Sequence, residues 1–264
     1  MTTWAVANQK GGVGKTTTAV TLAGWLARMG HEVLLVDLDP HGSLTSYFGL
    51  DPETLERGVY TLFERSVAKE PLDPQGVIHP TGFERLSVLP ASTALATLDR
   101  QLGAQGGMGL VVARALREVA GHYQHVFIDC PPMMGVLMVN ALAACEHLVV
   151  PVQTEFLALK GLERMVHSLE MIQRSRRMDL PYTIVPTMFD RRTRAAVDSL
   201  RQVRERYGAR VWEAMIPVDT QFREASKAGV PLSLRAPGSR GARAYQALLE
   251  SLIDRVQTNK AMAS

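Results

Sequence analysis

Residues 9–17 read Gln9-Lys10-Gly11-Gly12-Val13-Gly14-Lys15-Thr16-Thr17, and this run decides the fold. It follows a short apolar stretch, Trp4–Ala7, and precedes a helix-like run, Ala19–Met29. A strand, a glycine loop and a helix in this order are the setting of a phosphate-binding loop. Glycines let backbone N–H groups turn toward phosphates, and the positive end of the helix dipole adds to the attraction.

The residues of this loop that we expect to bind a nucleotide are Gly11, Gly12, Val13, Gly14, Lys15, Thr16 and Thr17. Lys15 should reach the β- and γ-phosphates, and the Thr16 hydroxyl should ligate Mg²⁺. The standard pattern places glycine where Gln9 stands, and Lys10 adds a second lysine. Because Lys15 already neutralises the phosphates, Lys10 suggests a charge aimed elsewhere, such as the nucleotide of a facing subunit. A glycine-rich β-turn before a helix is the alternative, which the intact GGVGKTT disfavours.

Three aspartates follow two apolar runs that read as buried strands. Asp37 and Asp39 end the first run, VLLVDLD, and Asp129 ends the second, HVFID. In an extended chain the i,i+2 spacing puts the first two carboxylates on the same side. Beside a phosphate loop they can serve Mg²⁺ and an attacking water, with Asp129 as a further magnesium-side acid. The alternative for any single strand-end aspartate is a helix or turn cap.

Apolar runs rich in β-branched residues alternate with helical patterns along the chain. The expected strands are Trp4–Asn8, Val33–Asp37, Leu86–Leu89, Val126–Asp129, Leu148–Val152, Thr183–Pro186 and Val211–Ile216. The expected helices are Thr16–Met29, Leu110–Ala120, Val136–Ala144, Leu159–Arg174, Ala195–Tyr207, Gln221–Lys227 and Ala242–Val256. This alternation predicts a single α/β domain over residues 1–264, with a mostly parallel twisted sheet covered by helices on both faces. Residues 50–85 read as an irregular insertion with one or two short helices, and residues 258–264 as a frayed tail.

Composition excludes several classes of protein. The longest apolar run, Met133–Ala144, is too short to cross a bilayer, so we expect no membrane insertion. Cys130 and Cys145 have neither disulfide-framework nor zinc-site spacing, and a reducing cytoplasm is the expected compartment. Residues 1–154 carry a net charge of −4 and residues 155–264 one of +7. The arginines of the second part indicate either a phosphate-backbone footprint or solvated, ion-paired helix faces.

Taken together, QKGGVGKTT, DLDPHGS and FIDCPP resemble the deviant Walker A, A′ and B motifs of the ParA/MinD superfamily of P-loop ATPases. The resemblance extends over roughly residues 3–256. It implies a P-loop NTPase fold and a homodimer that sandwiches two ATP molecules, with Lys10 reaching the other subunit's phosphates. It implies a catalytic set of Lys10, Lys15 and Asp39, with Thr16, Asp37 and Asp129 on the magnesium side. It further places Pro217 and Asp219 near the nucleotide base, where Asp219 replaces an asparagine.

The resemblance also indicates what kind of member this is. The last helix carries mixed charge rather than the basic face of a membrane-binding helix, and neither cysteine matches a cluster ligand of nitrogenase iron proteins. Arg192 matches a residue that binds DNA non-specifically in partition proteins, and Arg223 and Lys227 are further candidates. Val218 and Gln221, however, stand where partition proteins usually have arginines.

The runs DPHGSLTSYFG, LPASTALATLDRQ, GVLMVNALAA and IPVDTQFREAS resemble ParA-like ATPases of the ParC type, which position chemosensory arrays at the cell pole through a ParP or CheW-like adaptor. We therefore expect an ATP hydrolase that acts as a switch and positions such a cargo. The alternative is a plasmid or chromosome partition ATPase with a ParB-like partner on nucleoid DNA. A metabolic P-loop synthase and a DNA-binding regulator without turnover are further alternatives, which Lys10, Lys15 and Asp39 disfavour.

Overall fold

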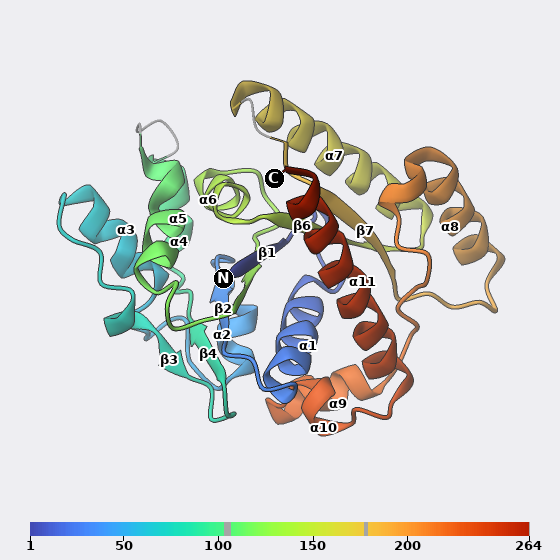
Figure 1. The fold of residues 1–264 in the computed structure, drawn as a ribbon, viewed down its shortest axis with the longest axis horizontal. Coiled ribbons are helices and arrows are strands. Elements are labelled where there is room, and N and C mark those ends of the chain that lie inside the picture. Colours follow the sequence, from blue (N-terminus) through green and yellow to red (C-terminus); the bar gives the residue numbers. More distant parts are fainter. Residues whose placement is uncertain (103–106, 177–178, 264) are drawn as a thin grey trace.

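The computed structural model describes residues 1–102, 107–176 and 179–263. Its centre is a seven-stranded sheet in the order β3-β4-β2-β5-β1-β6-β7 (Figure 1). The strands are β1 (Thr2–Val6), β2 (Val33–Asp37), β3 (His79–Pro80), β4 (Leu86–Leu89), β5 (His125–Asp129), β6 (His147–Gln153) and β7 (Tyr182–Thr187). All neighbouring pairs are parallel except the edge pair β3–β4. The carboxyl ends of the central strands therefore lie at one edge of the sheet, where ligands bind in such folds.

Helices cover both faces of the sheet. They are α1 (Lys15–Arg28), α2 (Ser43–Tyr47), α3 (Val59–Val67), α4 (Leu95–Leu102), α5 (Val111–Glu118), α6 (Val136–Ala144), α7 (Phe156–Arg176), α8 (Arg194–Tyr207), α9 (Gln221–Ala228), α10 (Leu232–Arg235) and α11 (Arg240–Ala263). Short 3₁₀ turns lie at Gln75–Val77, Met108–Leu110 and Gly208–Arg210. Among the described residues, no helix has the length and apolar character that a bilayer span requires.

The alternation of side chains along the strands divides the core into two layers. On β1, Trp4 and Val6 join the layer beneath α1, α10 and α11, whereas Ala5 joins the layer beneath α3, α5, α6 and α7. On β2, Leu35 joins the first of these layers and Leu34 the second. Period-2 alternation sends neighbours to opposite faces, and burial on both faces explains why these strands are continuously apolar. The sheet with helices on both faces confirms the expected fold class.

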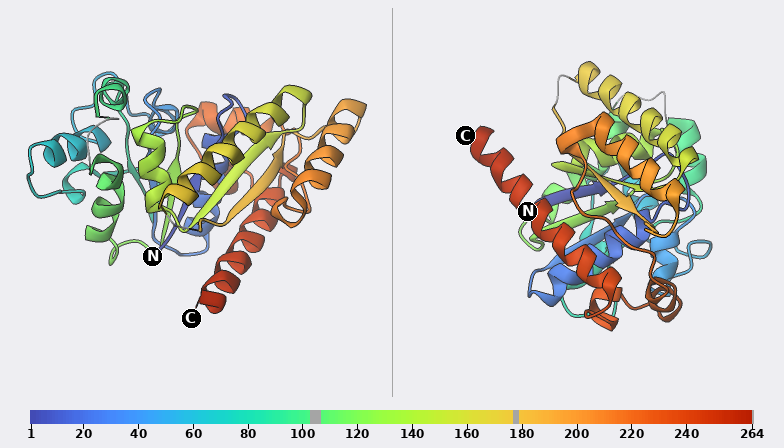
Figure 2. Two further views of the ribbon diagram at one scale, coloured as in Figure 1. Left: turned by 90° about the horizontal axis from the view of Figure 1, so that it is seen from above. Right: turned by 90° about the vertical axis from the view of Figure 1, so that its right-hand side faces the viewer.

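Several expected boundaries were wrong. Val211–Ile216 forms no strand; only isolated bridges join Ile184 to Val211 and Phe189 to Pro217. Trp212 and Ile216 donate their N–H groups to β7, while Glu213 and Ala214 between them face solvent, so pairing cannot continue. Helix α11 continues to Ala263 and thus includes most of the tail expected to fray, projecting beyond the rest of the chain (Figure 2).

Residues 50–85 contain the expected short helix α3, a 3₁₀ turn and the edge strand β3. Three short helices, α2, α4 and α10, had no counterpart among the expected elements. Helices of four or five residues such as α2 and α10 cannot show two turns of periodicity, which is the signal that sequence reading depends on.

Candidate functional site

The glycine loop joins β1 to α1 at the carboxyl edge of the sheet. Gly14 has φ +92° and caps the first turn of α1, a left-handed backbone that favours glycine. Apart from the neighbouring residues of the loop itself, no atom of the described structure lies within 4 Å of where a side chain at Gly11 or Gly12 would start. The loop is anchored by the Thr187 hydroxyl, which donates to the Val13 carbonyl oxygen at 2.9 Å. It therefore presents open backbone N–H groups at a helix N-terminus, which suits phosphate binding.

The two lysines of the loop have different surroundings. Lys15 begins α1 and is buried, with Nζ 3.5 Å from the Lys10 carbonyl oxygen. Lys10 instead forms an ion pair with Glu155, in the loop between β6 and α7. Its backbone N–H donates to Asn8 Oδ1 at 3.0 Å. Lys10 Nζ is thus paired with a carboxylate of another segment, whereas Lys15 Nζ lies against the backbone of the glycine loop.

The aspartates at the ends of β2 and β5 are brought together by strand register. Asp37 pairs in register with Asp129 across the β2–β5 ladder, at the carboxyl ends of both strands. Thr16 Oγ1 donates to Asp129 Oδ2 at 2.6 Å, which connects the glycine loop to this pair. Asp37 Oδ2 accepts bonds from the Thr45 N–H at 2.8 Å and the Thr45 hydroxyl at 2.7 Å.

Both carboxylates are costly to ionise without a cation. Burial raises the pKa of Asp37 to about 6, although bonds from Thr45 act in the opposite direction. Burial, followed by the charge of Asp37, raises the pKa of Asp129 to about 8, while the Thr16 bond and Lys15 lower it. Desolvation and a like charge both disfavour the ionised form. A cation placed here would reverse that preference.

The donor set fits a magnesium ion that shares its coordination with phosphate. Asp129 Oδ1 is buried and has no hydrogen-bond partner among the described residues, so it is an oxygen with a free lone pair beside the glycine loop. Within the described ranges no group of three or more His, Cys, Asp or Glu could hold a metal ion. Mg²⁺ typically takes one or two carboxylates, substrate phosphates and waters rather than an all-protein cage. Thr16, Asp37 and Asp129 match that requirement.

Asp39 lies in the turn after β2, two residues from Asp37. Its Oδ1 accepts bonds from the backbone N–H of His41 at 3.1 Å and from His41 Nδ1 at 2.8 Å. A cavity of about 320 Å³ opens beside it, lined by Asp39, Pro40, His41, Ala96, Arg100, Pro131, Pro132, Met133 and Leu137. Apart from Asp39, His41 and Arg100, these residues are apolar, so the space beside Asp39 offers few polar groups to a second substrate.

A larger cavity of about 680 Å³ lies next to the glycine loop and has the size of a ligand pocket. It is lined by residues that include Gly14, Thr17, Thr187, Pro217, Asp219, Arg223 and Lys227. Both carboxylate oxygens of Asp219 are engaged: Oδ1 accepts from the Gln221 N–H at 3.0 Å and Oδ2 from the Gly241 N–H at 2.9 Å. Asp219 therefore ties the start of α9 to the start of α11 in the wall of this cavity.

The three candidate DNA-binding residues do not form one group around this cavity. Arg223 and Lys227 lie one turn apart on α9 and line it. Arg192 does not line it; its guanidinium bonds to both oxygens of Asp190, at 2.9 Å and 2.7 Å. These bonds lower the pKa of Asp190 to about 2. Further arginines pair within the chain: Arg194 and Arg201 with Asp198, and Arg206 with Glu163. Part of the basic surface is thus internally neutralised.

Four residues around the glycine loop were missed by sequence reasoning. Asn8 ties the start of the loop to β6 by donating to the Pro151 carbonyl oxygen at 2.8 Å. Thr187 supports the loop from β7, Thr45 fixes Asp37 from α2, and Glu155 pairs with Lys10. Thr187 and Glu155 come from distant segments, so no local spacing identifies them, whereas Asn8 directly precedes the loop and Thr45 lies eight residues after Asp37.

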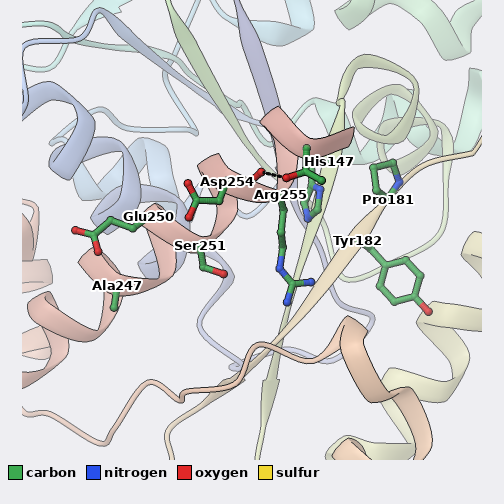
Figure 3. Close-up of a pocket in the computed structure, with 9 residues that line it drawn as sticks. His147, Pro181, Tyr182, Ala247, Glu250, Ser251, Asp254 and Arg255 are labelled. Carbon is green, nitrogen blue, oxygen red and sulfur yellow. Dashed lines mark hydrogen bonds between the residues drawn. The ribbon is translucent and has the colours of Figure 1, made fainter. Parts of the chain in front are cut away.

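A second region of interest lies at the opposite, amino-terminal edge of the sheet. A cavity of about 580 Å³ there is lined by His147, Pro181 and Tyr182 and by residues of α11 that include Ser251 and Arg255 (Figure 3). His147 is buried; its Nε2 lies 2.8 Å from the Thr183 hydroxyl, and its Nδ1 has no hydrogen-bond partner in the described part of the chain. Burial lowers the pKa of His147 to about 4. This cavity shares no residue with the phosphate site.

The glycine loop at the head of α1, with paired aspartates on the adjacent strand, defines a P-loop nucleotide-binding protein. Residues 1–182 match the family model described as an AAA domain. The chain is 42% identical over 255 residues to the chromosome-partitioning ATPase Soj of Thermus thermophilus, covering 96% of both chains. It is 37% identical over 242 residues to the sporulation initiation inhibitor protein Soj of Bacillus subtilis, covering 91% of this chain and 94% of that protein.

Among solved structures, cobyrinic acid a,c-diamide synthase from Mycobacterium smegmatis, with a bound ATP analogue and magnesium, has a TM-score of 0.83 and 33% identity. That match covers 98% of this chain and 97% of the other. The chain therefore belongs to the ParA/MinD superfamily of P-loop ATPases, as its motifs predicted. The chromosome-partitioning ATPase among these relatives fits the partition alternative better than the positioning of chemosensory arrays.

Proposed function

We propose that this chain is an ATP-dependent dimerising switch of the partition type. ATP binding closes a homodimer, and hydrolysis of ATP to ADP and phosphate reopens it. The observation that carries this proposal is the connection from the glycine loop through Thr16 and Asp129 to Asp37, with a free carboxylate oxygen at its centre. This geometry suits a triphosphate with a divalent cation, and the exposed loop with Lys10 beside it suits a facing subunit.

Each residue then has a defined task in positioning and charge neutralisation, which dominate phosphoryl transfer. Lys15 and the N–H groups of residues 11–16 would hold the phosphates, while Thr16, Asp37 and Asp129 would hold Mg²⁺. Mg²⁺, when bound, would neutralise the charge that develops on the phosphate oxygens. Asp39 would orient the attacking water, and Lys10 would leave Glu155 for the phosphates of the facing subunit. Only the γ-phosphate would hold the two subunits together, so its loss on hydrolysis would let the dimer separate.

The cargo that fits best is DNA, with a ParB-like protein as partner. The named relatives include a chromosome-partitioning ATPase that aligns over nearly the whole chain. The basic part of the chain supplies exposed cations, among them Arg223 and Lys227 on α9. Non-specific DNA binding by the ATP-bound dimer would place the protein on the nucleoid. Positioning of chemosensory arrays through a CheW-like adaptor is the less supported form of the same switch.

A metabolic synthase is the competing class, because a structure 33% identical to this chain is an amide synthase. Such an enzyme needs polar groups that hold a second substrate near the γ-phosphate. The cavity beside Asp39 is lined largely by proline, alanine, methionine and leucine. That lining favours protein contact over a polar metabolite, and it supports the switch.

The decisive experiment is the Asp39→Ala variant, studied with Mg-ATP by light scattering and by binding to a non-specific DNA duplex. We expect ATP binding to persist, turnover to be lost and the variant to remain a DNA-bound dimer. The exposed variant Asp179→Asn is the matched control. Wild-type turnover in Asp39→Ala would refute the role of Asp39, and a monomer that ignores both ATP and DNA would refute the switch.

A further inference from the structure

The turn after β2 holds the Asp39 carboxylate by one oxygen only. Oδ1 accepts the backbone N–H of His41 at 3.1 Å and its imidazole Nδ1 at 2.8 Å. Within the residues that the structure describes, Oδ2 accepts no hydrogen bond. Both donors to the carboxylate therefore belong to one residue, and the second oxygen remains available to a ligand.

The two bonds from His41 differ in what they require. The backbone bond closes an Asx turn, which any residue other than proline could provide at this position. The imidazole bond depends on the histidine side chain. An ionised carboxylate can only accept a hydrogen bond, so Nδ1 must carry the proton in this pair. The His41 side chain is 79% exposed and that of Asp39 is 13% exposed. Burial in the core therefore does not explain why a histidine stands at position 41, since its imidazole lies on the solvent side of the Asp39 carboxylate.

The turn itself is fixed by other contacts. The Gly42 N–H donates to the Asp39 carbonyl oxygen at 2.8 Å, and a side chain at Gly42 would start 2.5 Å from Pro52. Arg100, which lines the same cavity, directs its Nε to the Ala96 carbonyl oxygen at 3.2 Å. Within the described structure, the His41 imidazole is thus the side-chain donor that restrains rotation of the Asp39 carboxylate.

We propose that His41 is a positioning residue for ATP hydrolysis, holding Asp39 Oδ1 so that Oδ2 faces the attacking water. This inference rests on the proposed function, in which Asp39 orients that water. Small displacements of a catalytic group cost rate rather than substrate binding. Loss of the imidazole should therefore lower kcat and leave the KM for ATP, the nucleotide affinity and ATP-dependent dimerisation unchanged.

Three substitutions separate positioning from structure. His41→Ala removes the side-chain donor. His41→Asn keeps an N–H close to the place of Nδ1, whereas His41→Gln carries its amide farther out, near the place of Nε2. The exposed residue His122 supplies a matched control, His122→Ala. The measurements are kcat and KM for ATP, affinity for a fluorescent ATP analogue and the thermal unfolding midpoint of each variant.

We expect kcat to fall by about tenfold or more in His41→Ala, with KM within about twofold, and to recover largely in His41→Asn but not in His41→Gln. Equal rates in His41→Ala and wild type, while Asp39→Ala is inactive, would overturn the role of His41 and leave the proposed function standing. A His41→Asn variant as slow as His41→Ala, or a loss of nucleotide affinity in His41→Ala, would also overturn it. Absence of turnover in wild type would refute the proposed function, and with it this role.

Discussion

Lys10 forms an ion pair with Glu155 of the same chain, although its position in the glycine loop predicts that it binds phosphate. The two side chains are 27% and 43% exposed. A pair with this much solvent contact is worth at most about 1 kcal/mol. The phosphates of a facing subunit carry several charges and can displace Glu155 as the partner of Lys10. The pair is therefore a weak contact that does not prevent the role proposed for Lys10 at the facing nucleotide.

Lys10→Ala should abolish ATP-dependent dimerisation, because the charge that reaches the facing nucleotide is gone. Light scattering with and without Mg-ATP measures this, and the affinity of the monomer for ATP should change little. Glu155→Gln is the informative counterpart: it releases Lys10 in both subunits and should shift dimerisation to lower protein concentration by about thirtyfold or less, since each dimer breaks two such pairs. A Lys10→Ala variant that dimerises with ATP as wild type does would contradict this role.

Sequence patterns predicted the central strands and the main helices because buried parallel strands and amphipathic helices leave local signals. The grouping of Thr16, Asp37 and Asp129 was also predictable, since the carboxyl ends of parallel strands meet at one edge. Thr45 follows Asp37 by eight residues, but its contact depends on the short helix α2, which leaves no periodic signal. Glu155 was not predictable, because tertiary folding alone places it beside Lys10. Asp219 shows the same limit, since its bond to Gly241 joins residues far apart in the chain.

In the protein without nucleotide and magnesium, Asp129→Asn should reduce the loss of folding stability that wild type shows as the pH rises. An acid whose pKa is raised in the fold stabilises the fold while it is protonated. That contribution is complete below the ordinary value of 3.8 and is lost as the pH rises through about 8. Asparagine carries no charge and avoids the loss. Urea unfolding at pH 5 and pH 8 should therefore show a smaller fall in stability for Asp129→Asn than for wild type.

The same variant should gain less stability from Mg-ATP than wild type does, since it lacks one oxygen proposed to hold the ion. Asp179→Asn, an exposed carboxylate, is the matched control and should follow wild type in both experiments. An identical pH dependence for Asp129→Asn and wild type would show that Asp129 is not the buried acid responsible.

His147 should make the protein sensitive to acid. Its pKa is lowered from 6.5 to about 4 by burial, so the fold prefers the neutral imidazole. A base with a lowered pKa contributes stability above its ordinary pKa, and the contribution is lost as the pH falls toward the lowered value. Between pH 7.5 and pH 5 the loss should be about 2 kcal/mol. Urea unfolding of His147→Gln should show a smaller loss over this range, whereas the exposed His122→Gln should behave as wild type.

DNA binding by the ATP-bound dimer should depend on arginines that the free chain keeps paired. Arg192 is bound by Asp190, so a phosphate must replace that carboxylate before the contact forms. Arg192→Ala should weaken binding to any duplex and reduce the slope of log K against log salt by about 0.9 for each Arg192 of the dimer that contacts a phosphate. Asp190→Asn should act in the opposite direction and strengthen binding, because the competing carboxylate is gone.

The two variants together separate a DNA contact from a loop support. If Arg192 served only to hold the turn before α8, both substitutions would disturb the same bidentate contact and would weaken DNA binding alike. If Arg192 contacts phosphate, their effects have opposite sign, and Arg223→Ala or Lys227→Ala shows whether α9 belongs to the same surface. Fluorescence anisotropy with a labelled duplex at several salt concentrations gives all of these slopes. Binding that is absent even at low salt would assign the basic part of the chain to a protein partner instead.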